Sequence, residues 1–251
     1  MHWFLSLVLV GVGGLACGEI SVVESDGGQV FDASNQADAA ADASPDLETT
    51  ITAIQSGGVP DMSEVVLTDV VVTGISISGR HFWIQDQGAA AAFNGIFVFR
   101  GMALLPADVR VGSTISLRGT YLEYLGGLSE ILDVEFLSIA NTPSSIAVLQ
   151  GIDLETLASD DQYEGVVVEL GGVRVFAGSD PKCESFCSFV LGSAEASLVA
   201  TDGIFHHPDI VTGECYDVRG IMHRDPKHNL VIQLLSDNYI SPSTTTSRPH
   251  S

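Results

Sequence analysis

Residues 112–119 read GSTISLRG, and residues 213–220 read GECYDVRG. The two stretches align without a gap, so that Gly, Arg and Gly recur at the same offsets. A match of this kind over a long interval indicates two copies of one structural unit. Alternate residues are apolar in both copies, which is the period of a strand with one buried face. We expect these side chains to face a core: Ile115 and Leu117 in the first copy, and Tyr216 and Val218 in the second.

The arginines of the two copies fall on the opposite face. Arg118 and Arg219 are out of phase with the apolar positions, which predicts that they point away from the core. Each copy begins at a glycine, Gly112 or Gly213, so we expect each strand to follow a turn.

Short β-branched or aromatic runs broken by Gly, Asp and Asn extend outward from both copies. Five runs precede Pro143 and five follow it: VVLTDVVVTGISI, HFWIQD, GIFVFR, STISLRGTYLEYL and SEILDVEFL, then YEGVVVELGGVRVF, SFVLGS, ASLVAT, ECYDVRGIM and NLVIQLL. Triple valines also recur, at 70–72 and 166–168. This pattern favours a tandem of five-stranded units over one sandwich of nine or ten strands. Between the two sets, Ile152 to Ala158 is the one stretch that predicts a helix, with Asp153 as its cap.

The composition is that of a folded but acidic protein. The 251 residues are 45% hydrophobic and 17% charged, and the mean hydropathy is +0.30, so the chain can bury a core. Ten Lys and Arg oppose 32 Asp and Glu, which gives a formal net charge of -22. Such a charge excludes a broad electrostatic grip on phosphate backbones.

The N-terminal segment has the features of an export signal. The run of about ten apolar residues from Trp3 to Val12 has the length of a signal-peptide core and is too short to span a bilayer. The sequence LACG at 15–18 resembles the lipobox of bacterial lipoproteins, which implies that Cys17 becomes a lipidated N-terminus. The following Gly18 favours, by the same resemblance, an outer membrane or cell-surface location. An ordinary secretory signal, giving a periplasmic or secreted protein, is the alternative.

A low-complexity acidic segment follows the signal. Residues 18–50 contain eight acids from Glu19 to Glu48 and no Lys or Arg, which predicts a disordered linker. Next to a lipobox we interpret it as a spacer that holds a domain off a membrane, and a solvated tail without a role is the alternative.

The first set of runs carries a family resemblance. The stretches ITAIQSGG, VVVTGI, FWIQD, NGIFVF and VRVGSTISLRGTYLEYLGGLSEI, from residue 51 to about 137, resemble the OB-fold domain that precedes the endonuclease/exonuclease/phosphatase domain of secreted bacterial nucleases. The stretches DQYEGVVVEL, LVATDGIFHHP and TGECYDVRGIM resemble the following OB-like domain of the same proteins more loosely. The resemblance implies an all-β fold of two tandem five-stranded OB-like Greek-key barrels. We therefore predict five segments: a signal peptide at 1–17, a linker at 18–50, barrels at 51–141 and 142–241, and a tail at 242–251.

The sequence contains no motif that indicates catalysis. The chain ends where the nuclease domain would begin, and it lacks the G-x-S-x-G, P-loop, H-E-x-x-H and EF-hand patterns. We expect no enzymatic activity and no cofactor. The acidic pair Asp160-Asp161 is interpreted as solvated, with a calcium site as the alternative.

Cysteines and histidines gather in the second barrel: Cys183, Cys187, His206, His207, Cys215, His223 and His228. Their spacings do not match a zinc motif, so we predict no metal site and a disulfide in an exported protein. Cys183 and Cys187 are the nearest pair, and Cys215 is an alternative partner for either. The pair His206-His207 before Pro208 is interpreted as loop structure.

OB-folds hold oligonucleotides or oligosaccharides across strands 2 and 3, by aromatic stacking and by cations that follow the backbone. The candidates by position are Arg80 and His81 in the first loop, Trp83 on strand 2, Phe97 on strand 3 with Arg100 at its end, and Tyr121 and Tyr124 at the end of strand 4. The alternative is that the aromatics belong to the core and that the arginines are ordinary surface charges.

Two functions are favoured, and an enzyme of unrecognised type, which rests only on the cluster of cysteines and histidines, is a third. The first is a noncatalytic exported lipoprotein that binds an extended ligand, either single-stranded nucleic acid or a glycan. The second is an interaction protein that docks a partner protein, such as a separately encoded hydrolase, through its acidic field.

Overall fold

The structure is a computed structural model of the chain. It describes residues 47–124, 127–140, 142–177, 188–192, 196–201, 210–225, 229–234 and 240–243. The predictions for the following residues lie outside these ranges: the signal peptide, Cys17, most of the linker, Cys183, Cys187, His206, His207 and His228. Within the described ranges, no helix is long and apolar enough to cross a membrane.

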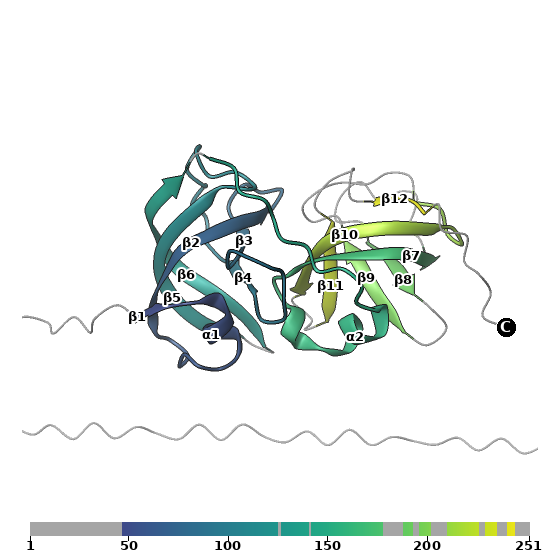
Figure 1. Cartoon of the computed structure of the whole chain (residues 1–251), viewed down its shortest axis with the longest axis horizontal. Coiled ribbons are helices and arrows are strands. Elements are labelled where there is room, and N and C mark those ends of the chain that lie inside the picture. The colour runs from purple at the N-terminus through teal and green to yellow at the C-terminus, as the bar shows by residue number, and fades with distance from the viewer. Residues whose placement is uncertain are drawn as a thin grey trace, which may run out of the picture. The chain divides into compact units, whose positions relative to one another are not determined.

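The first barrel is a closed sheet of five strands (Figure 1). Its strands are β2 (Glu64–Ile75), β3 (Phe82–Gln85), β4 (Gly95–Val98), β5 (Thr114–Tyr124) and β6 (Leu128–Ala140). They pair in the order β2-β3-β4-β6-β5, and β2 pairs with β5 to close the barrel. The β4–β6 pair is parallel and the others are antiparallel. Two elements precede β2: β1 (Leu47–Thr49), which lies parallel to it, and α1 (Ile51–Gln55).

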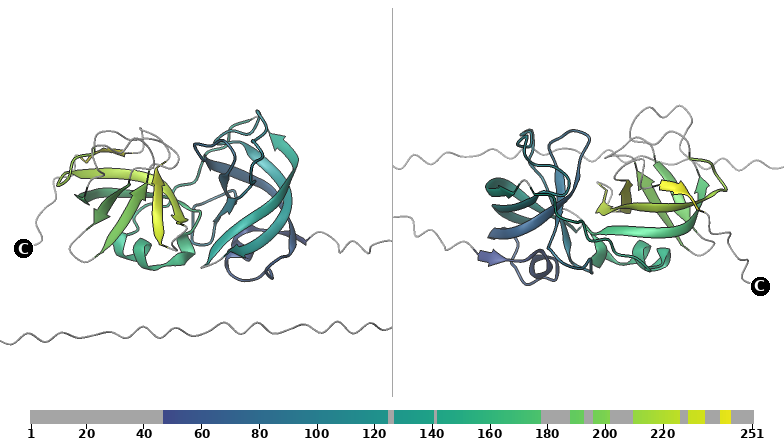
Figure 2. Two further views of the ribbon diagram at one scale, coloured as in Figure 1. Left: turned by 180° about the vertical axis from the view of Figure 1, so that it is seen from behind. Right: turned by 45° about the horizontal axis from the view of Figure 1, so that its top comes forward.

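The second barrel repeats this arrangement (Figure 2). Its strands are β7 (Val167–Ala177), β8 (Ser188–Gly192), β9 (Ser197–Thr201), β10 (Cys215–Arg224) and β11 (Leu230–Leu234), followed by β12 (Ile240–Pro242) on β10. The order is β11-β9-β8-β7-β10, closed by the β10–β11 pair, and the β9–β11 pair is again parallel. The prediction of two tandem five-stranded OB-like barrels is confirmed.

The two copies of the Gly-Arg-Gly pattern occupy equivalent places at the start of β5 and β10. The predicted turns are confirmed, since Gly112 and Gly213 have φ values of 88° and 95°, a region that favours glycine. The predicted faces are confirmed as well. The apolar positions are buried, and Arg118 and Arg219 pair on the outer face with Glu135 of β6 and Glu169 of β7, respectively.

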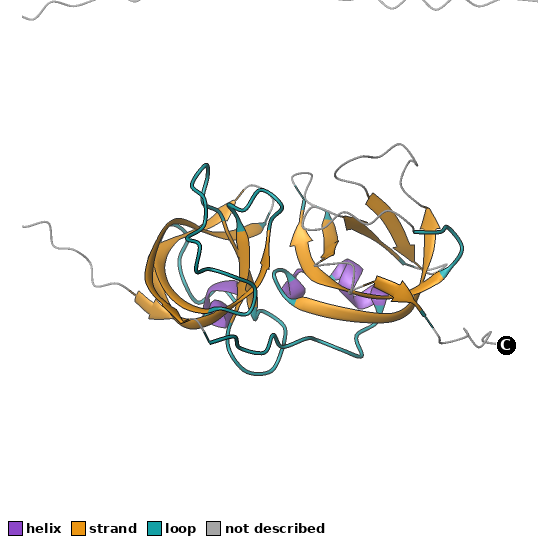
Figure 3. Cartoon of the chain, turned by 90° about the horizontal axis from the view of Figure 1, so that it is seen from above, coloured by secondary structure: helices purple, strands orange, loops and turns teal. Residues whose placement is uncertain are grey.

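Strands dominate the described chain, and the helices are short (Figure 3). The predicted helix is α2 (Leu154–Ser159), and the Asp153 side chain caps it by accepting a hydrogen bond from the Thr156 backbone N–H at 2.7 Å. A 3-10 turn (Asp161–Tyr163) follows it. Helix α1 shows no signal in the sequence, because five residues are too few to show a helical period.

Each barrel encloses its own core. Inward side chains of β2 to β6 pack on the two buried isoleucines of α1, and those of β7 to β11 pack on Leu157 of α2. In both barrels, therefore, a short helix contributes to the core directly before the first strand.

The second glycine of each copy has no room for a side chain. A Cβ on Gly119 would lie 2.5 Å from Ile131 Cγ2, and one on Gly220 would lie 2.5 Å from the carbonyl oxygen of Gln233. We expect Gly119→Ala and Gly220→Ala each to lower the free energy of unfolding by about 1 to 3 kcal/mol through overpacking. Chemical denaturation measures this. In the control Gly171→Ala, the nearest atom to the new Cβ is 3.8 Å away, and we expect little change. An unchanged unfolding midpoint in both test variants would contradict the assigned strand register.

Candidate functional site

The outer face of β3 and β4 carries a row of aromatic rings. These strands are antiparallel, and Trp83 lies opposite Phe97. Because side chains alternate along a strand, Phe82, Ile84, Ile96 and Val98 point into the core while Trp83 and Phe97 point outward. His81 and Phe99 continue the outward row beyond the ends of the two strands.

The rings of His81 and Phe99 form an exposed stack. Their centroids are 4.6 Å apart and their planes differ by 6°. Phe99 is 40% exposed, so one partner of the stack is open to solvent. This pair offers a flat apolar surface to a planar ligand.

A backbone hydrogen bond fixes the His81 ring. The Arg100 N–H donates to His81 Nδ1 at 3.2 Å, so Nδ1 is an acceptor and the neutral ring carries its proton on Nε2. Partial burial, together with the nearby Arg80 charge, lowers the pKa of His81. The stack is therefore uncharged at neutral pH.

Two guanidinium groups flank the stack. Arg80 Nη1 donates to Met102 Sδ at 3.4 Å, and Arg100 Nη1 donates to the Leu104 carbonyl oxygen at 2.7 Å. Arg100 also lies over the Phe136 ring, 5.0 Å from its centroid. Neither arginine forms an ion pair within the described part of the chain, unlike Arg118, Arg219 and Arg224. Both keep donors available for an anionic ligand.

Exposed apolar side chains surround the two arginines. Ile77, Met102 and Leu104 are 64%, 77% and 68% exposed. They come from the β2–β3 loop and the β4–β5 loop, which are joined by a hydrogen bond from the Leu105 N–H to the Gly79 carbonyl at 3.1 Å. We call the whole set the loop patch: Ile77, Arg80, His81, Phe99, Arg100, Met102 and Leu104.

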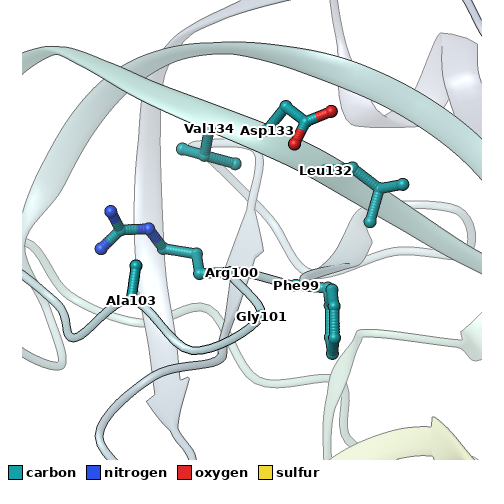
Figure 4. A pocket seen from close by; sticks show the side chains of 7 residues that line it. All are labelled: Phe99, Arg100, Gly101, Ala103, Leu132, Asp133 and Val134. Carbon is teal, nitrogen blue, oxygen red and sulfur yellow. The ribbon is translucent and has the colours of Figure 1, made fainter.

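A cleft of about 350 Å³ adjoins the loop patch. Figure 4 shows Arg100 and Ala103 on one side of it and Leu132, Asp133 and Val134 of β6 on the other, with Phe99 at one end. Asp133 has a φ of 50° and an exposed side chain, so the cleft has one carboxylate opposite its guanidinium.

Trp83 and Phe97, two of the candidate stacking rings, are buried in this structure, which is the alternative that the sequence left open. Their exposed fractions are only 4% and 8%. They pack with Val167 and Ile221 of the second barrel in an apolar cluster that we call the junction. In the described arrangement their faces are therefore covered by protein.

Backbone contacts complete the junction. Gln85 Oε1 accepts a hydrogen bond from the Val167 N–H at 2.9 Å, and Gln85 Nε2 donates to Asn94 Oδ1 at 3.2 Å. A Cβ on Gly95 would lie 2.1 Å from the carbonyl group of Gly165. The two barrels thus approach each other at a place where neither has a side chain.

His223 of β10 lies against the same rings. Its ring meets Trp83 edge-on at 5.3 Å and Phe97 at 5.1 Å. Burial lowers the pKa of His223 to about 4, so the ring is neutral at physiological pH.

Ionisable groups from both barrels meet beside the junction. Arg224 Nη2 lies 2.6 Å from Asp161 Oδ1, and Arg224 Nε lies 4.0 Å from Glu164 Oε2. Burial raises the pKa of Glu164 to about 8, a rise that the Arg224 charge opposes and the charges of Glu123 and Asp161 support. Glu164 is therefore largely protonated at neutral pH.

The free energy of the junction is the balance between the burial of apolar side chains and the cost of buried polar atoms without partners. Burying an apolar side chain contributes about 1.5 to 3 kcal/mol, and the cluster contains four of them. Trp83 Nε1, His223 Nδ1 and Glu164 Oε1 are buried without a hydrogen-bond partner among the described residues. Each such atom costs about 1 to 3 kcal/mol. The net stabilisation is thus well below what the apolar contacts alone suggest.

The two tyrosines do not join the loop patch. Tyr121 is 6% exposed and belongs to the first core, and its hydroxyl donates to Glu123 Oε2 at 2.8 Å. Its expected role as a ligand contact is corrected, and burial together with Glu123 raises its pKa to about 12. Tyr124 is 48% exposed, but it pairs with Leu128, which packs on the junction cluster. Tyr124 therefore lies near the junction cluster.

The described residues show no group of three or more His, Cys, Asp or Glu side chains that could hold a metal ion. Cys215 is half-buried and is a free thiol. The predicted pairing of Cys183 with Cys187 lies outside the described residues and stays a prediction.

Comparisons with known proteins give distant likenesses. No protein-family model and no curated protein sequence matches the chain. A solved structure of a murine DNA-binding protein bound to double-stranded DNA is 12% identical, with a TM-score of 0.33, over 68% of this chain and 94% of that chain. The tetrameric p202 HIN2 is 14% identical, with a TM-score of 0.31, over 72% of this chain and 92% of that chain. Both TM-scores are low, and the OB-like assignment rests on the strand order of this chain.

Sequence reasoning missed several residues of the site. Ile77, Met102 and Leu104 look like core residues in the sequence, because an isolated aliphatic residue carries no signal of exposure. Gly95 and Gly165 lie in short turn-like contexts that do not reveal a backbone contact between barrels. Only the proximity of the two loops and of the two barrels identifies these residues.

Glu164 makes the stability of the fold depend on pH. Its pKa is raised from 4.5 to about 8, so folding favours the protonated carboxyl. The associated stabilisation is fully present below about pH 4.5 and is lost as the pH rises to about 8. We expect the Tm of the wild type to fall between about pH 5 and about pH 8.5. In Glu164→Gln this fall should be smaller by about 2 to 4 °C. Thermal unfolding followed by circular dichroism measures it.

The control for this experiment is Glu135→Gln, which removes an exposed carboxylate. Its change of Tm with pH should follow that of the wild type. An identical change in Glu164→Gln and the wild type would show that Glu164 titrates normally.

Proposed function

We propose that this protein is a noncatalytic binding module that holds single-stranded nucleic acid at the loop patch. The observation that carries the proposal is the exposed His81–Phe99 stack between two arginines that have no ion pair in the described structure. A planar base can stack on Phe99, and the guanidinium groups can donate hydrogen bonds to phosphate oxygens.

The size of the patch limits the affinity. Stacking contributes about 1 to 3 kcal/mol per base, and one ring pair accommodates one or two bases. The net charge of -22 repels a long polyanion, so binding depends on local contacts and weakens with salt. We therefore propose a short ligand segment and modest affinity.

A partner protein is the second candidate ligand. Ile77, Met102 and Leu104 are exposed aliphatic side chains, which neither stack on bases nor bind phosphates. Exposed apolar, aromatic and Arg side chains together are typical of protein interfaces. Two results together would favour this function. The chain would not bind nucleic acid, and it would capture a protein that no longer binds when Met102 and Leu104 are replaced.

We also infer that the protein is exported and held at a membrane through Cys17. The support is the apolar run from Trp3 to Val12 and the lipobox-like sequence at 15–18. The acidic segment that follows would then act as the spacer between the lipid anchor and the barrels.

Replacing Phe99 tests the binding function. We expect the full chain to bind fluorescently labelled single-stranded DNA or RNA. Its affinity should decrease when the salt concentration is raised from about 50 to about 200 mM. Phe99→Ala should weaken binding about tenfold, because it removes the exposed stacking ring. Fluorescence anisotropy measures both.

The matched control is Phe176→Ala, which removes a ring of similar exposure, 49%, on β7 of the second barrel. It should bind like the wild type. Equal losses in both variants, or no binding by the wild type at low salt, would refute the nucleic-acid function.

Replacing Cys17 tests the anchor. In a bacterial host supplied with an alkyne-labelled fatty acid, the wild-type chain should be labelled and should sediment with membranes. Cys17→Ser should be unlabelled, because it lacks the thiol that accepts the lipid. Labelling of Cys17→Ser would show that this cysteine is not the acceptor.

A further inference from the structure

The aromatic row of the first barrel continues past the loop patch and beneath the second barrel. The centroid distance is 4.6 Å from Phe99 to His81, 5.9 Å from His81 to Phe97, and 5.0 Å from Phe97 to Trp83. The four rings form one unbroken surface on the outer face of β3 and β4. Its exposed part ends where the second barrel begins.

A small number of contacts covers this surface. Val167, Ile221 and His223 contact the two buried rings, and Gly165 meets Gly95 through the backbone. Val167 and Ile221 belong to the junction cluster and not to the core of the second barrel. The barrels also meet outside this cluster, since the Phe93 N–H donates to the Gln162 carbonyl at 2.6 Å and Ala90 packs on the second core.

Covering the rings leaves polar atoms without hydrogen bonds. Trp83 Nε1 and His223 Nδ1 are both buried and have no partner among the residues that the structure describes. Separation of the barrels would return both atoms to water, and this gain opposes the loss of apolar contact.

The segment between the barrels is anchored to each of them by backbone hydrogen bonds. The Ser144 N–H donates to the Gly112 carbonyl of the first barrel at 2.8 Å. Leu149 bridges to the second barrel, since its N–H donates to Val167 and its carbonyl accepts from Glu169, both at 2.9 Å. The residues between these anchors, 145–148, connect the two barrels and include two side chains that pack on the junction, Ile146 and Val148.

We propose that the described arrangement is a covered state, in which the second barrel blocks half of the ligand surface, and that separating the barrels adds Trp83 and Phe97 to the loop patch. The proposal rests on the proposed function of the loop patch. The ligand of the uncovered surface is a longer single strand, because two more rings stack two more bases. The second barrel thereby controls both the affinity and the length of strand that is bound.

Two variants uncover the surface by different means. Gly95→Ala places a methyl group 2.1 Å from the Gly165 backbone, and the three nearest atoms to the new Cβ all belong to residues 165 and 166. Ile221→Gln puts a polar side chain into the apolar cluster and replaces no residue of the aromatic row. Gly171→Ala, whose Cβ has room, is the control.

The first measurement needs no ligand. In the full chain carrying Trp3→Phe, Trp83 is the sole tryptophan. We expect red-shifted emission and stronger acrylamide quenching in Gly95→Ala and Ile221→Gln, with unchanged far-UV circular dichroism. The Gly171→Ala control should match the Trp3→Phe parent. Emission that stays blue in both test variants would overturn the proposal.

The second measurement is anisotropy with labelled single strands of two lengths, about three and about ten nucleotides. We expect the two uncovered variants to bind the longer strand about tenfold more tightly than the parent, and Trp83→Leu to remove this gain. The parent could bind and lose affinity with Phe99→Ala while the two uncovered variants show no gain. That result would overturn this proposal and leave the proposed function standing. Absence of binding by the parent and the uncovered proteins alike would overturn both.

Discussion

Burial of β3 and β4 on both faces determines what the first barrel can present to a ligand. The inner side chains, such as Phe82 and Ile96, fill the barrel core, and the outer ones, Trp83 and Phe97, lie under the second barrel. A strand that is buried on both sides has no polar face, which explains why these two strands read as nearly continuous apolar runs. Because the cover stops at the strand ends, the exposed part of the row is confined to the loops that follow. The part of the aromatic row that is exposed at the candidate site is therefore set by how far the second barrel covers β3 and β4.

The electrostatics of the loop patch differ from those of the chain as a whole. The chain has a net charge of -22, and Arg118, Arg219 and Arg224 are held in ion pairs. Arg80 and Arg100 instead bond to a sulfur atom and a carbonyl oxygen beside an exposed ring. Charges separated by more than about 8 Å are largely screened at physiological salt, so a bound ligand responds mainly to these two cations and to the Asp133 carboxylate of the adjoining cleft. A net acidic protein can in this way carry a small site for an anionic, planar ligand.

The junction combines apolar packing with unpaired polar atoms and buried charge. Its four apolar side chains favour contact, while Trp83 Nε1, His223 Nδ1 and Glu164 Oε1 oppose it. Such a balance makes the net stabilisation of the contact smaller than its apolar packing alone would give. It also links their contact to pH, since Glu164 prefers its neutral form there. A junction of this kind is suited to exposing the covered rings when a ligand competes for them.

The sequence by itself determined the strands, their faces and their duplication. The Gly-Arg-Gly repeat and the two-residue apolar period depend only on local geometry, so they predicted the tandem of five-stranded units and the inward positions of β5 and β10, while the resemblance to OB-fold domains implied that the units are barrels. Arg80, His81 and Arg100 were also identified, because the OB-fold resemblance implies that ligands bind along strands 2 and 3 and the loops at their ends. The sequence could not decide which side of β3 and β4 is open, since period two separates the faces of a strand without assigning either to solvent. Tertiary structure decided that Trp83 and Phe97 are covered, that Tyr121 is core and that Ile77, Met102 and Leu104 are exposed, because exposure depends on contacts between segments far apart in the chain.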